Sequence, residues 1–358
     1  MSDLKSERYR QHIDRLLEQS SHIVTEQGYD RLLIHSGRPR LRFQDDHSPA
    51  FRAHPYFVHW VPLVQHVDGL IEIQPGRRPI LYLTLPDDYW HARPVEPEPW
   101  WADQFDIQIG ASAEAWRPRL DDARATALIA EPGDVSDLGR HISLNPAPLL
   151  WCLDEQRTVK TEWQIDCMRS ANERAVAGHQ AAERAFAQGC SELDIHLAYL
   201  KAAQHDPDAL PYGSIVALNE HAAILHYQYL NASPPARRYS FLIDAGADCL
   251  GYAADITRTY VANEAPDAVI FKDLLQGMDR LQLQLADAAM PGVEYVDLND
   301  QAHRGVAELM DEAGLCDLSI DAMLGRGLTG RFLPHGLGHH IGVQVHDVGG
   351  RTDAEGRR

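Results

Sequence analysis

The sequence lacks any long apolar run and any excess of positive charge. Its longest mostly apolar stretch, residues 79–85, has about seven residues, whereas a helix that crosses a bilayer needs roughly twenty. The polar residues 1–8 contain no apolar core, so we expect no secretory signal. The 52 acidic residues outnumber the 33 Lys and Arg and give a formal net charge of −19, which disfavours general binding to nucleic-acid phosphates.

Closely spaced cysteines are also missing. The five cysteines are odd in number, scattered along the chain, and form no CxxC pair. This spacing predicts reduced thiols in a cytoplasmic protein rather than a disulfide framework or a thiolate metal site. They are Cys152, Cys167, Cys190, Cys249 and Cys316.

What is present is the composition of a globular protein, with 44% hydrophobic and 24% charged residues in 358. At about 150 residues per domain this length predicts two domains, which we place at residues 1–155 and 156–358. In the first we expect a helix at 7–27 and strands at 31–35, 58–64, 70–73, 79–85 and 127–130, which make it a mixed α/β unit.

The second part opens with the clearest helix signal in the chain. Thr161 and Gln164 fit a capping box, a helical face follows, and Gly189 is a stop signal. Further helices are predicted at 191–204, 266–290 and 296–313, and strands at 214–219 and within 239–262. The overall class is therefore α/β (α+β).

Two aspartates occupy a predicted β-hairpin. If the turn is centred between Cys249 and Leu250, then Asp244 and Asp255 are equally far from it and face each other across the strands. Opposed Cβ atoms lie about 4.5–5.5 Å apart, so the two carboxylates repel and call for a proton or a cation. A bridged metal pair is one interpretation, and two solvated strand-end aspartates is the other.

Histidine is concentrated near the end of the chain. Neutral imidazole is a common ligand of transition metals, and the interleaved glycines let backbone approach closely. His339 and His346 are seven residues apart and would lie on opposite faces of a regular strand, so a bend near Gly342 is needed to bring them together. The four histidines are His335, His339, His340 and His346, of which His340 is the expected bystander.

A weaker signal joins Tyr212 to His221, His226 and Tyr227 beside a predicted strand. By itself this group is more typical of ordinary packing and surface than of a site.

Together these residues resemble the pita-bread metallopeptidases, and specifically bacterial prolidases (Xaa-Pro dipeptidases) with the related organophosphorus acid anhydrolases. The likeness covers essentially the whole chain, with its motifs in the family's order. It implies a mixed α/β N-terminal domain followed by a pita-bread catalytic domain. The matching strings are NEHAA at 219–223, DAGA at 244–247, DITRT at 255–259, HGLGHHIGVQVHD at 335–347, and, in the first domain, residues 33–37, 45–46 and 85–91.

The resemblance implies a role for each matched residue. Asp244, Asp255 as the bridge, and His339 would hold two divalent metals, usually Mn²⁺, with Co²⁺ or Zn²⁺ as alternatives. A hydroxide bound between the metals would attack the scissile carbonyl of a dipeptide that ends in proline. The catalytic pocket histidines would be His226, His335 and His346. The small subsite would be formed by Tyr212, Val345 and Asp45, with Asp45 lent by the neighbouring subunit of a homodimer.

The sequence departs from the family pattern after Asp347. Two glutamate ligands and a substrate-binding arginine are not found there, and the only later acids are Asp353 and Glu355. We therefore expect a catalytic domain that is incomplete at its C-terminal end, that binds metal weakly and that hydrolyses little. Two alternatives stay open: an organophosphate-type hydrolase or Xaa-Pro aminopeptidase of the same fold, and a non-catalytic remnant or binding protein.

Overall fold

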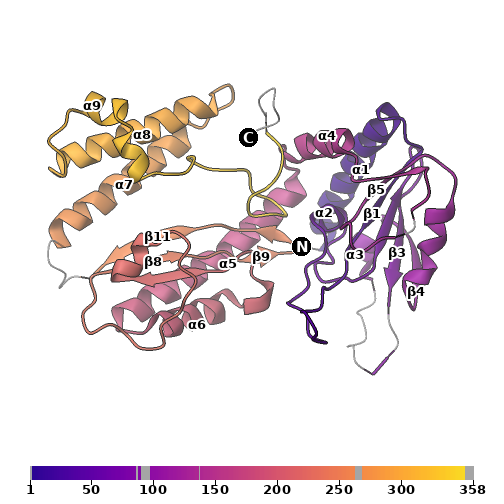
Figure 1. Ribbon diagram of the computed structural model, residues 1–358, viewed down its shortest axis with the longest axis horizontal. Coiled ribbons are helices and arrows are strands. Elements are labelled where there is room, and N and C mark those ends of the chain that lie inside the picture. The colour runs from indigo at the N-terminus through magenta and orange to yellow at the C-terminus, as the bar shows by residue number, and fades with distance from the viewer. Residues whose placement is uncertain (1, 86–87, 90–96, 137, 263–267, 351–358) are drawn as a thin grey trace.

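The computed structural model describes residues 2–85, 88–89, 97–136, 138–262 and 268–350. The molecule has two parts side by side, each built around its own sheet (Figure 1). Residues 86–87 and 90–91 of the matching stretch 85–91, residues 266–267 of the predicted helix 266–290, and the two late acids Asp353 and Glu355 lie outside the described ranges. No helix among the described residues has both the length and the apolar character that a membrane crossing requires.

The first part is a six-stranded mixed sheet in the order β4-β3-β2-β1-β5-β6. Its strands are β1 (Arg31–His35), β2 (Leu70–Ile73), β3 (Ile80–Thr84), β4 (Asp106–Gly110), β5 (Thr126–Ile129) and β6 (Ile142–Leu144). Its helices are α1 (Ser2–Glu26), α2 (Pro55–Trp60), α3 (Pro99–Ala102) and α4 (Ala147–Arg157), with the short 3₁₀ helices η1 (Ala113–Ala115) and η2 (Arg117–Asp121).

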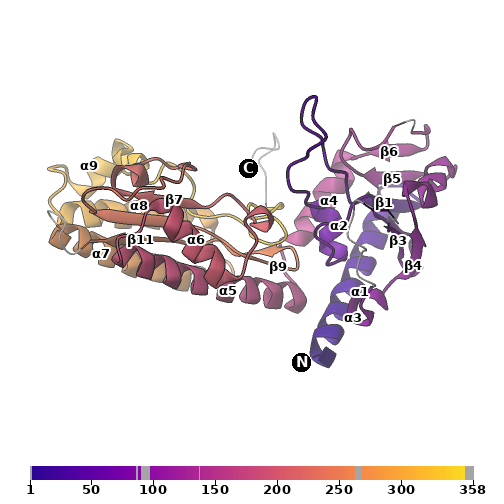
Figure 2. The ribbon, with the colours of Figure 1, turned by 90° about the horizontal axis from the view of Figure 1, so that it is seen from below.

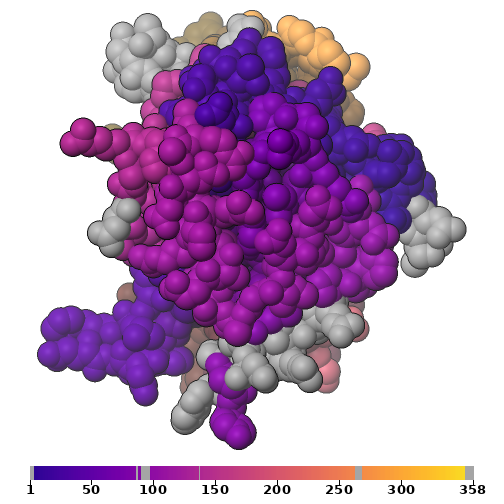
Figure 3. Space-filling model, turned by 90° about the vertical axis from the view of Figure 1, so that its right-hand side faces the viewer, coloured from indigo at the N-terminus to yellow at the C-terminus, as the bar shows by residue number. Residues whose placement is uncertain are grey.

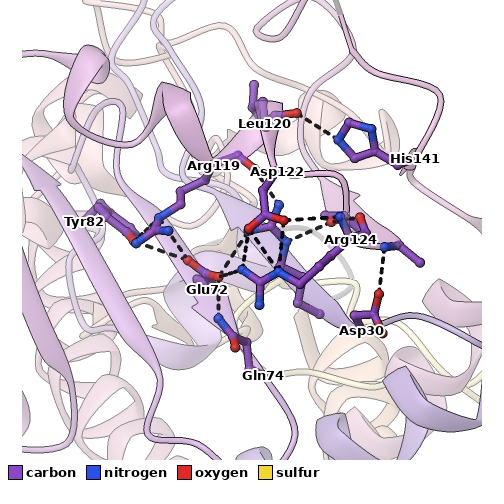
Figure 4. A network of polar contacts seen from close by, with 12 residues as sticks. Asp30, Glu72, Gln74, Tyr82, Arg119, Leu120, Asp122, Arg124 and His141 are labelled. Carbon is purple, nitrogen blue, oxygen red and sulfur yellow. Dashed lines mark hydrogen bonds and ion pairs between the residues drawn. The ribbon is translucent and has the colours of Figure 1, made fainter.

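A buried ionic network runs through this sheet (Figure 4). The side chains of Arg31 on β1 and Glu72 on β2 are 0% exposed, and their Nη1 and Oε1 atoms are 3.2 Å apart. Arg119 and Arg124 approach the same carboxylate at 3.5 Å from the partly exposed side. Glu72 occupies a buried position of β2 where an apolar residue would be expected. A buried charge is tolerated only when it is paired, and these arginines provide the pairing.

The predicted strand at 58–64 is wrong. This stretch contains the end of helix α2 and the turn after it. Pro55 occupies the first turn of α2, where its missing N–H costs nothing and its fixed φ favours the helix. Phe57, Val58 and Trp60 are buried in the core, and a short apolar run of this kind does not by itself distinguish a helix from a strand.

The second part is a three-stranded antiparallel sheet in the order β11-β8-β7, formed by β7 (Ile215–Leu218), β8 (Ser240–Asp244) and β11 (Thr257–Val261). A two-stranded hairpin of β9 (Asp248–Cys249) and β10 (Tyr252–Ala253) interrupts the chain between β8 and β11. The helices are α5 (Glu162–Ala187), α6 (Glu192–Ala203), α7 (Ala268–Ala288), α8 (Tyr295–Glu312) and α9 (Ile320–Gly325), with 3₁₀ helices η3 (Pro207–Ala209), η4 (Asn219–Ala223) and η5 (Leu328–Arg331).

The strongest helix prediction is confirmed at both ends. The Thr161 side chain accepts from the Gln164 N–H, and the Gln164 side chain accepts from the Thr161 N–H, which is the predicted capping box. At the other end Gly189 has φ +86°, and the Gly189 and Cys190 N–H groups donate to Phe186 O and Ala185 O, as in a Schellman motif. Helices α5 and α6 then pack on one face of the sheet (Figure 1).

One hydrophobic core is shared by the two parts. The Trp163 ring at the start of α5 meets Tyr9 of α1 edge-on, with centroids 5.1 Å apart. Tyr252 of β10 and Val343 of the histidine segment belong to the same buried cluster as the sheet residues of the first part. The hairpin and the histidine segment are therefore held against the first part. The boundary at residue 155 stays a prediction.

Candidate metal centre

Asp244 is placed by the alternation of β8. Phe241 and Ile243 are fully buried in the core that β8 shares with α5 and α6. Successive side chains of a strand point to opposite faces, so Asp244, at the end of β8, projects from the face away from these helices.

The predicted hairpin register is wrong by two residues. Asp244 lies opposite Thr257, not Asp255, and the same register continues through Cys249 and Tyr252 in the hairpin. The turn is centred on Leu250 and Gly251, both with positive φ, as in a type I′ turn. A slip of two keeps side chains on the same face, so Asp255 still lies on the face of Asp244, diagonally rather than directly across.

Tyr212 joins the two aspartates. Its hydroxyl lies 2.7 Å from Asp244 Oδ1 and 2.9 Å from Asp255 Oδ1. A Cβ at Gly246 would lie 2.7 Å from the Tyr212 ring and 2.0 Å from the Ala254 carbonyl oxygen, so only glycine leaves room here. Tyr212 was predicted from the resemblance as a residue of the small subsite; its contact with both carboxylates is a finding of the structure.

The electrostatics of the pair favour a cation. Burial raises the pKa of Asp244, and the negative charge of Asp255 raises it further, against the lowering effect of the Tyr212 hydrogen bond. Burial raises the pKa of Tyr212 far above its ordinary value, and the negative charge of Asp244 is the second largest cause. The phenol therefore stays protonated. A hydroxyl has one proton to donate, which leaves the repulsion between two carboxylates only partly compensated.

The histidine segment reaches this pair through a bend. It forms no strand in residues 334–350, contrary to its strand-like sequence. The Asp347 N–H donates to His340 O and the Ala253 N–H donates to Gly342 O, which closes a loop and docks it on β10. His339 Nε2 thereby lies 3.3 Å from Asp255 Oδ2, and the rings of His339 and His346 meet edge-on at 4.4 Å. The bend required near Gly342 is therefore confirmed.

The other predicted pocket residues have no observed contact with the aspartates within the described ranges. His226 is exposed in the turn after η4. His335 is exposed, and its Nδ1 lies beside the carbonyl oxygen of the next residue, Gly336. Val345 is partly buried, and Asp45 is exposed in a loop of the first part. No hydrogen bond, ion pair or ring contact within the described ranges joins these four to the aspartates. Their predicted roles stay predictions.

Three contacts at the site were not predicted. Thr257 lies directly opposite Asp244 across the sheet, and the buried His179 Nε2 lies 3.0 Å from the Ala245 carbonyl oxygen beside Asp244. Asp347, which is 5% exposed, pairs with Arg157 and lies 2.7 Å from Lys160 Nζ, fixing the end of the histidine loop. A corrected register would have pointed to Thr257; the pairing of Asp347 depends on residues almost two hundred positions away.

The donor set fits a divalent metal in its chemistry. Asp244, Asp255 and His339 offer carboxylate oxygen and imidazole nitrogen, a mixture that suits Mn²⁺, Co²⁺ or Zn²⁺ better than Ca²⁺. Their contacts are pairwise: within the described ranges no three side chains of His, Cys, Asp or Glu are arranged closely enough to hold an ion together.

Known proteins match this chain along nearly its whole length. Residues 7–154 match the family model described as the N-terminal domain of Xaa-Pro dipeptidase, and residues 166–357 match metallopeptidase family M24. A protein of Pseudoalteromonas atlantica named Xaa-Pro dipeptidase is 41% identical over 348 residues, which are 97% of this chain and 79% of that relative. One of Xanthomonas euvesicatoria with the same name is 40% identical over 352 residues, 98% and 79% of the two chains.

Solved structures show the same fold at low identity. The aminopeptidase of Pseudomonas aeruginosa aligns with a TM-score of 0.74 and 19% identity, over 97% of this chain and 83% of that one. Aminopeptidase P of Escherichia coli in its low-pH form aligns with a TM-score of 0.76 and 17% identity, over 98% and 84%. These matches support the pita-bread architecture and carry no information about substrate.

Proposed function

This chain belongs to metallopeptidase family M24, and from that premise we propose that it is an Xaa-Pro dipeptidase, a hydrolase that cleaves dipeptides with proline at the C-terminal position. The observation that supports this substrate is the sequence identity of about 40%, over nearly the whole chain, to proteins named for that activity. The match of residues 7–154 to the N-terminal domain of the same enzymes supports it independently of the catalytic part.

In this proposal Asp244, Asp255 and His339 hold divalent metal, a pair of Mn²⁺ ions by the family likeness. When bound, the metal would supply Lewis acidity and lower the pKa of a water bound to it to about 7. The contact of Tyr212 with both aspartates and of His346 with His339 supports roles for these two residues in orienting ligands and substrate. His226, His335 and Val345 are proposed to line the substrate pocket.

A homodimer follows from the same likeness. The loop that carries Asp45 stands out from the body of the first part (Figures 2 and 3). Its apolar side chains Leu41 and Phe43 are 63% and 91% exposed, which supports contact with a second subunit, to whose small subsite Asp45 would contribute. Light scattering that gives the mass of a single chain, 40.1 kDa, would contradict this. The unpaired thiols of all five cysteines agree with a cytoplasmic location.

The test combines turnover with metal binding on the 358-residue protein. We expect slow release of proline from Ala-Pro that requires Mn²⁺, and a Mn²⁺-dependent rise in melting temperature that is weaker than in longer relatives. Asp255→Asn should abolish both, whereas Asp287→Asn, a substitution of an exposed aspartate on α7, should change neither.

The outcomes separate the alternatives. Faster cleavage of longer Xaa-Pro peptides than of Ala-Pro would indicate an aminopeptidase, and turnover of organophosphates alone would indicate the anhydrolase group. A Mn²⁺-induced stabilisation that Asp255→Asn removes, without turnover of any substrate, would indicate a metal-binding protein without catalysis. Absence of both turnover and stabilisation would contradict the proposed site.

A further inference from the structure

A buried glutamate at the start of α6 binds four groups from the segment that follows β7. Glu192 is 1% exposed. Its carboxylate accepts from the backbone N–H groups of Leu218 at 2.9 Å and Asn231 at 3.0 Å. His221 Nδ1 lies 2.7 Å from Oε1, and the Tyr227 hydroxyl donates to Oε2 at 2.7 Å. An ionised carboxylate can only accept, so His221 carries a proton on Nδ1.

These four donors saturate the carboxylate of Glu192. Each of its two oxygens receives one backbone N–H and one side-chain donor. Burial acts to raise the pKa of Glu192, but the hydrogen bonds, led by that of His221, outweigh it and lower the pKa. Glutamine has almost the same shape but only one acceptor oxygen, so it would leave part of the donor set facing an NH₂ group.

The turn that carries His226 is held from both sides by this carboxylate. The Ile224 N–H donates to His221 O at 3.0 Å, and the Tyr227 N–H donates to Ile224 O at 3.2 Å. The rings of His221 and Tyr227 stack with their centroids 4.5 Å apart. His226 therefore lies in the chain between two residues whose side chains both end on Glu192, while its own side chain is exposed.

This turn lies on the face of the sheet that carries Asp244. Tyr227 belongs to a small buried cluster with Ile215 and Ala217 of β7, against which Leu242 of β8 packs. Ile215 is paired with Asp244 and Ala217 with Leu242 across the two strands. Directly paired residues of neighbouring strands project from the same face. The turn is therefore on the side of the carboxylates, opposite the face that α5 and α6 cover.

We propose that Glu192 is a positioning residue that holds the His226 imidazole in place on the face of the sheet that carries the candidate metal centre. The inference rests on the proposed function, in which His226 lines the substrate pocket. Glu192 acts through the turn at 224–227 and not on the substrate itself. Because its hydrogen bonds are made before a dipeptide arrives, the cost of ordering the turn does not have to be met on binding.

The first measurement asks whether Glu192 holds the turn. In hydrogen exchange of the 358-residue protein, Glu192→Gln should speed exchange of the Leu218 and Asn231 amides about tenfold, the effect of one lost hydrogen bond. The control is Asp194→Asn, which changes a carboxylate in the same turn of α6 that bonds to Ser191 instead, and exchange at 218–231 should match the parent. Unchanged exchange in Glu192→Gln would overturn the proposal.

The second measurement separates positioning from general support of the fold. Steady-state kinetics on Ala-Pro with Mn²⁺ compare the parent, Glu192→Gln, His226→Ala and the double variant. We expect each single substitution to raise KM about tenfold with little change in kcat, and the double variant to match His226→Ala. A KM in the double variant that rises by the product of the two factors would show that Glu192 does not act through His226, and would overturn the proposal.

A milder variant covers the case in which Glu192→Gln does not fold. Tyr227→Phe removes one of the four donors and keeps the ring, so KM should rise about threefold in the parent and not at all in the His226→Ala background. An unchanged KM in Tyr227→Phe and Glu192→Gln would contradict the proposal. A parent protein without turnover of Ala-Pro, but with the exchange result above, would instead contradict the proposed function, and the substrate role of Glu192 would fall with it.

Discussion

At the scale of single residues, the site favours the binding of a cation, and its two close carboxylates lower the stability of the metal-free folded protein. Tyr212 has one proton for two carboxylates, and the pKa of Asp244 is raised by burial and by Asp255. The folded state therefore binds a proton at Asp244 more tightly than the unfolded state does. This contribution to stability is present below the unfolded pKa and is lost as the pH rises through the folded pKa.

Removing this charge should stabilise the metal-free protein. We expect Asp244→Asn in EDTA to raise the free energy of unfolding at pH 7 by roughly 0.5–2 kcal/mol, the range of single stabilising substitutions. Asn does not titrate, so the advantage should shrink as the pH falls from 7 through the raised folded pKa of Asp244 towards the ordinary aspartate pKa of about 4 in the unfolded chain. Urea unfolding across this range measures it, with the exposed Asp103→Asn as the control. A variant less stable than the parent at pH 7 would show that Tyr212 satisfies both carboxylates.

At the scale of elements, the hairpin shows where local rules fail. Leucine is a poor residue for a positive φ, so the sequence did not mark Leu250 and Gly251 as the turn. Leu250 nevertheless adopts φ +54° because its side chain packs against the core shared by the two parts. The spacing of the two aspartates predicted that they face each other across a hairpin, whereas their diagonal placement depends on this packing.

Gly251 should be sensitive for two separable reasons. Its φ is +92°, and a Cβ would lie 2.2 Å from Val58 Cγ1 of α2. Gly292 has nearly the same φ, +91°, with nothing within 4 Å of the added atom. We expect Gly292→Ala to cost about 1 kcal/mol from backbone strain alone and Gly251→Ala to cost about 1–3 kcal/mol more from overpacking, measured by denaturant unfolding. Equal losses in the two variants would mean that Val58 moves aside freely.

At the scale of the whole molecule, the histidine segment is held by the first part. Arg157, at the end of α4, is 3% exposed and pairs with Asp347, which is also bonded to Lys160. Arg52 adds a second connection, 2.7 Å from Asp248 in the hairpin. The two halves of the candidate centre, carboxylates and imidazoles, are thus positioned against each other by residues of the N-terminal region.

Breaking this buried pair should loosen the histidine loop. Asp347→Ala removes the carboxylate that pairs with the buried Arg157 guanidinium, and the Gln344 side chain, whose Oε1 lies 3.1 Å from Arg157 Nη2, has no charge to replace it, so we expect a loss of ~3–5 kcal/mol in the free energy of unfolding. Arg157→Met combined with Asp347→Leu should recover most of that loss, because neither charge remains. A double-mutant cycle followed by chemical denaturation gives the coupling. Additive effects of the single substitutions would show that the pair is not coupled.

The sequence by itself determined the elements whose signals are local. The capping box and stop of α5 and most strands follow from residue type and spacing, which act over a few residues. The metal-ligand roles of Asp244, Asp255 and His339 were expected from the family resemblance, and the bend near Gly342 was only a condition for bringing His339 and His346 together. Only the tertiary structure decided the hairpin register, the helix at α2, the bridging position of Tyr212 and the pairing of Asp347. Each of these is a contact between distant segments, and packing of the shared core selects it over the local preference.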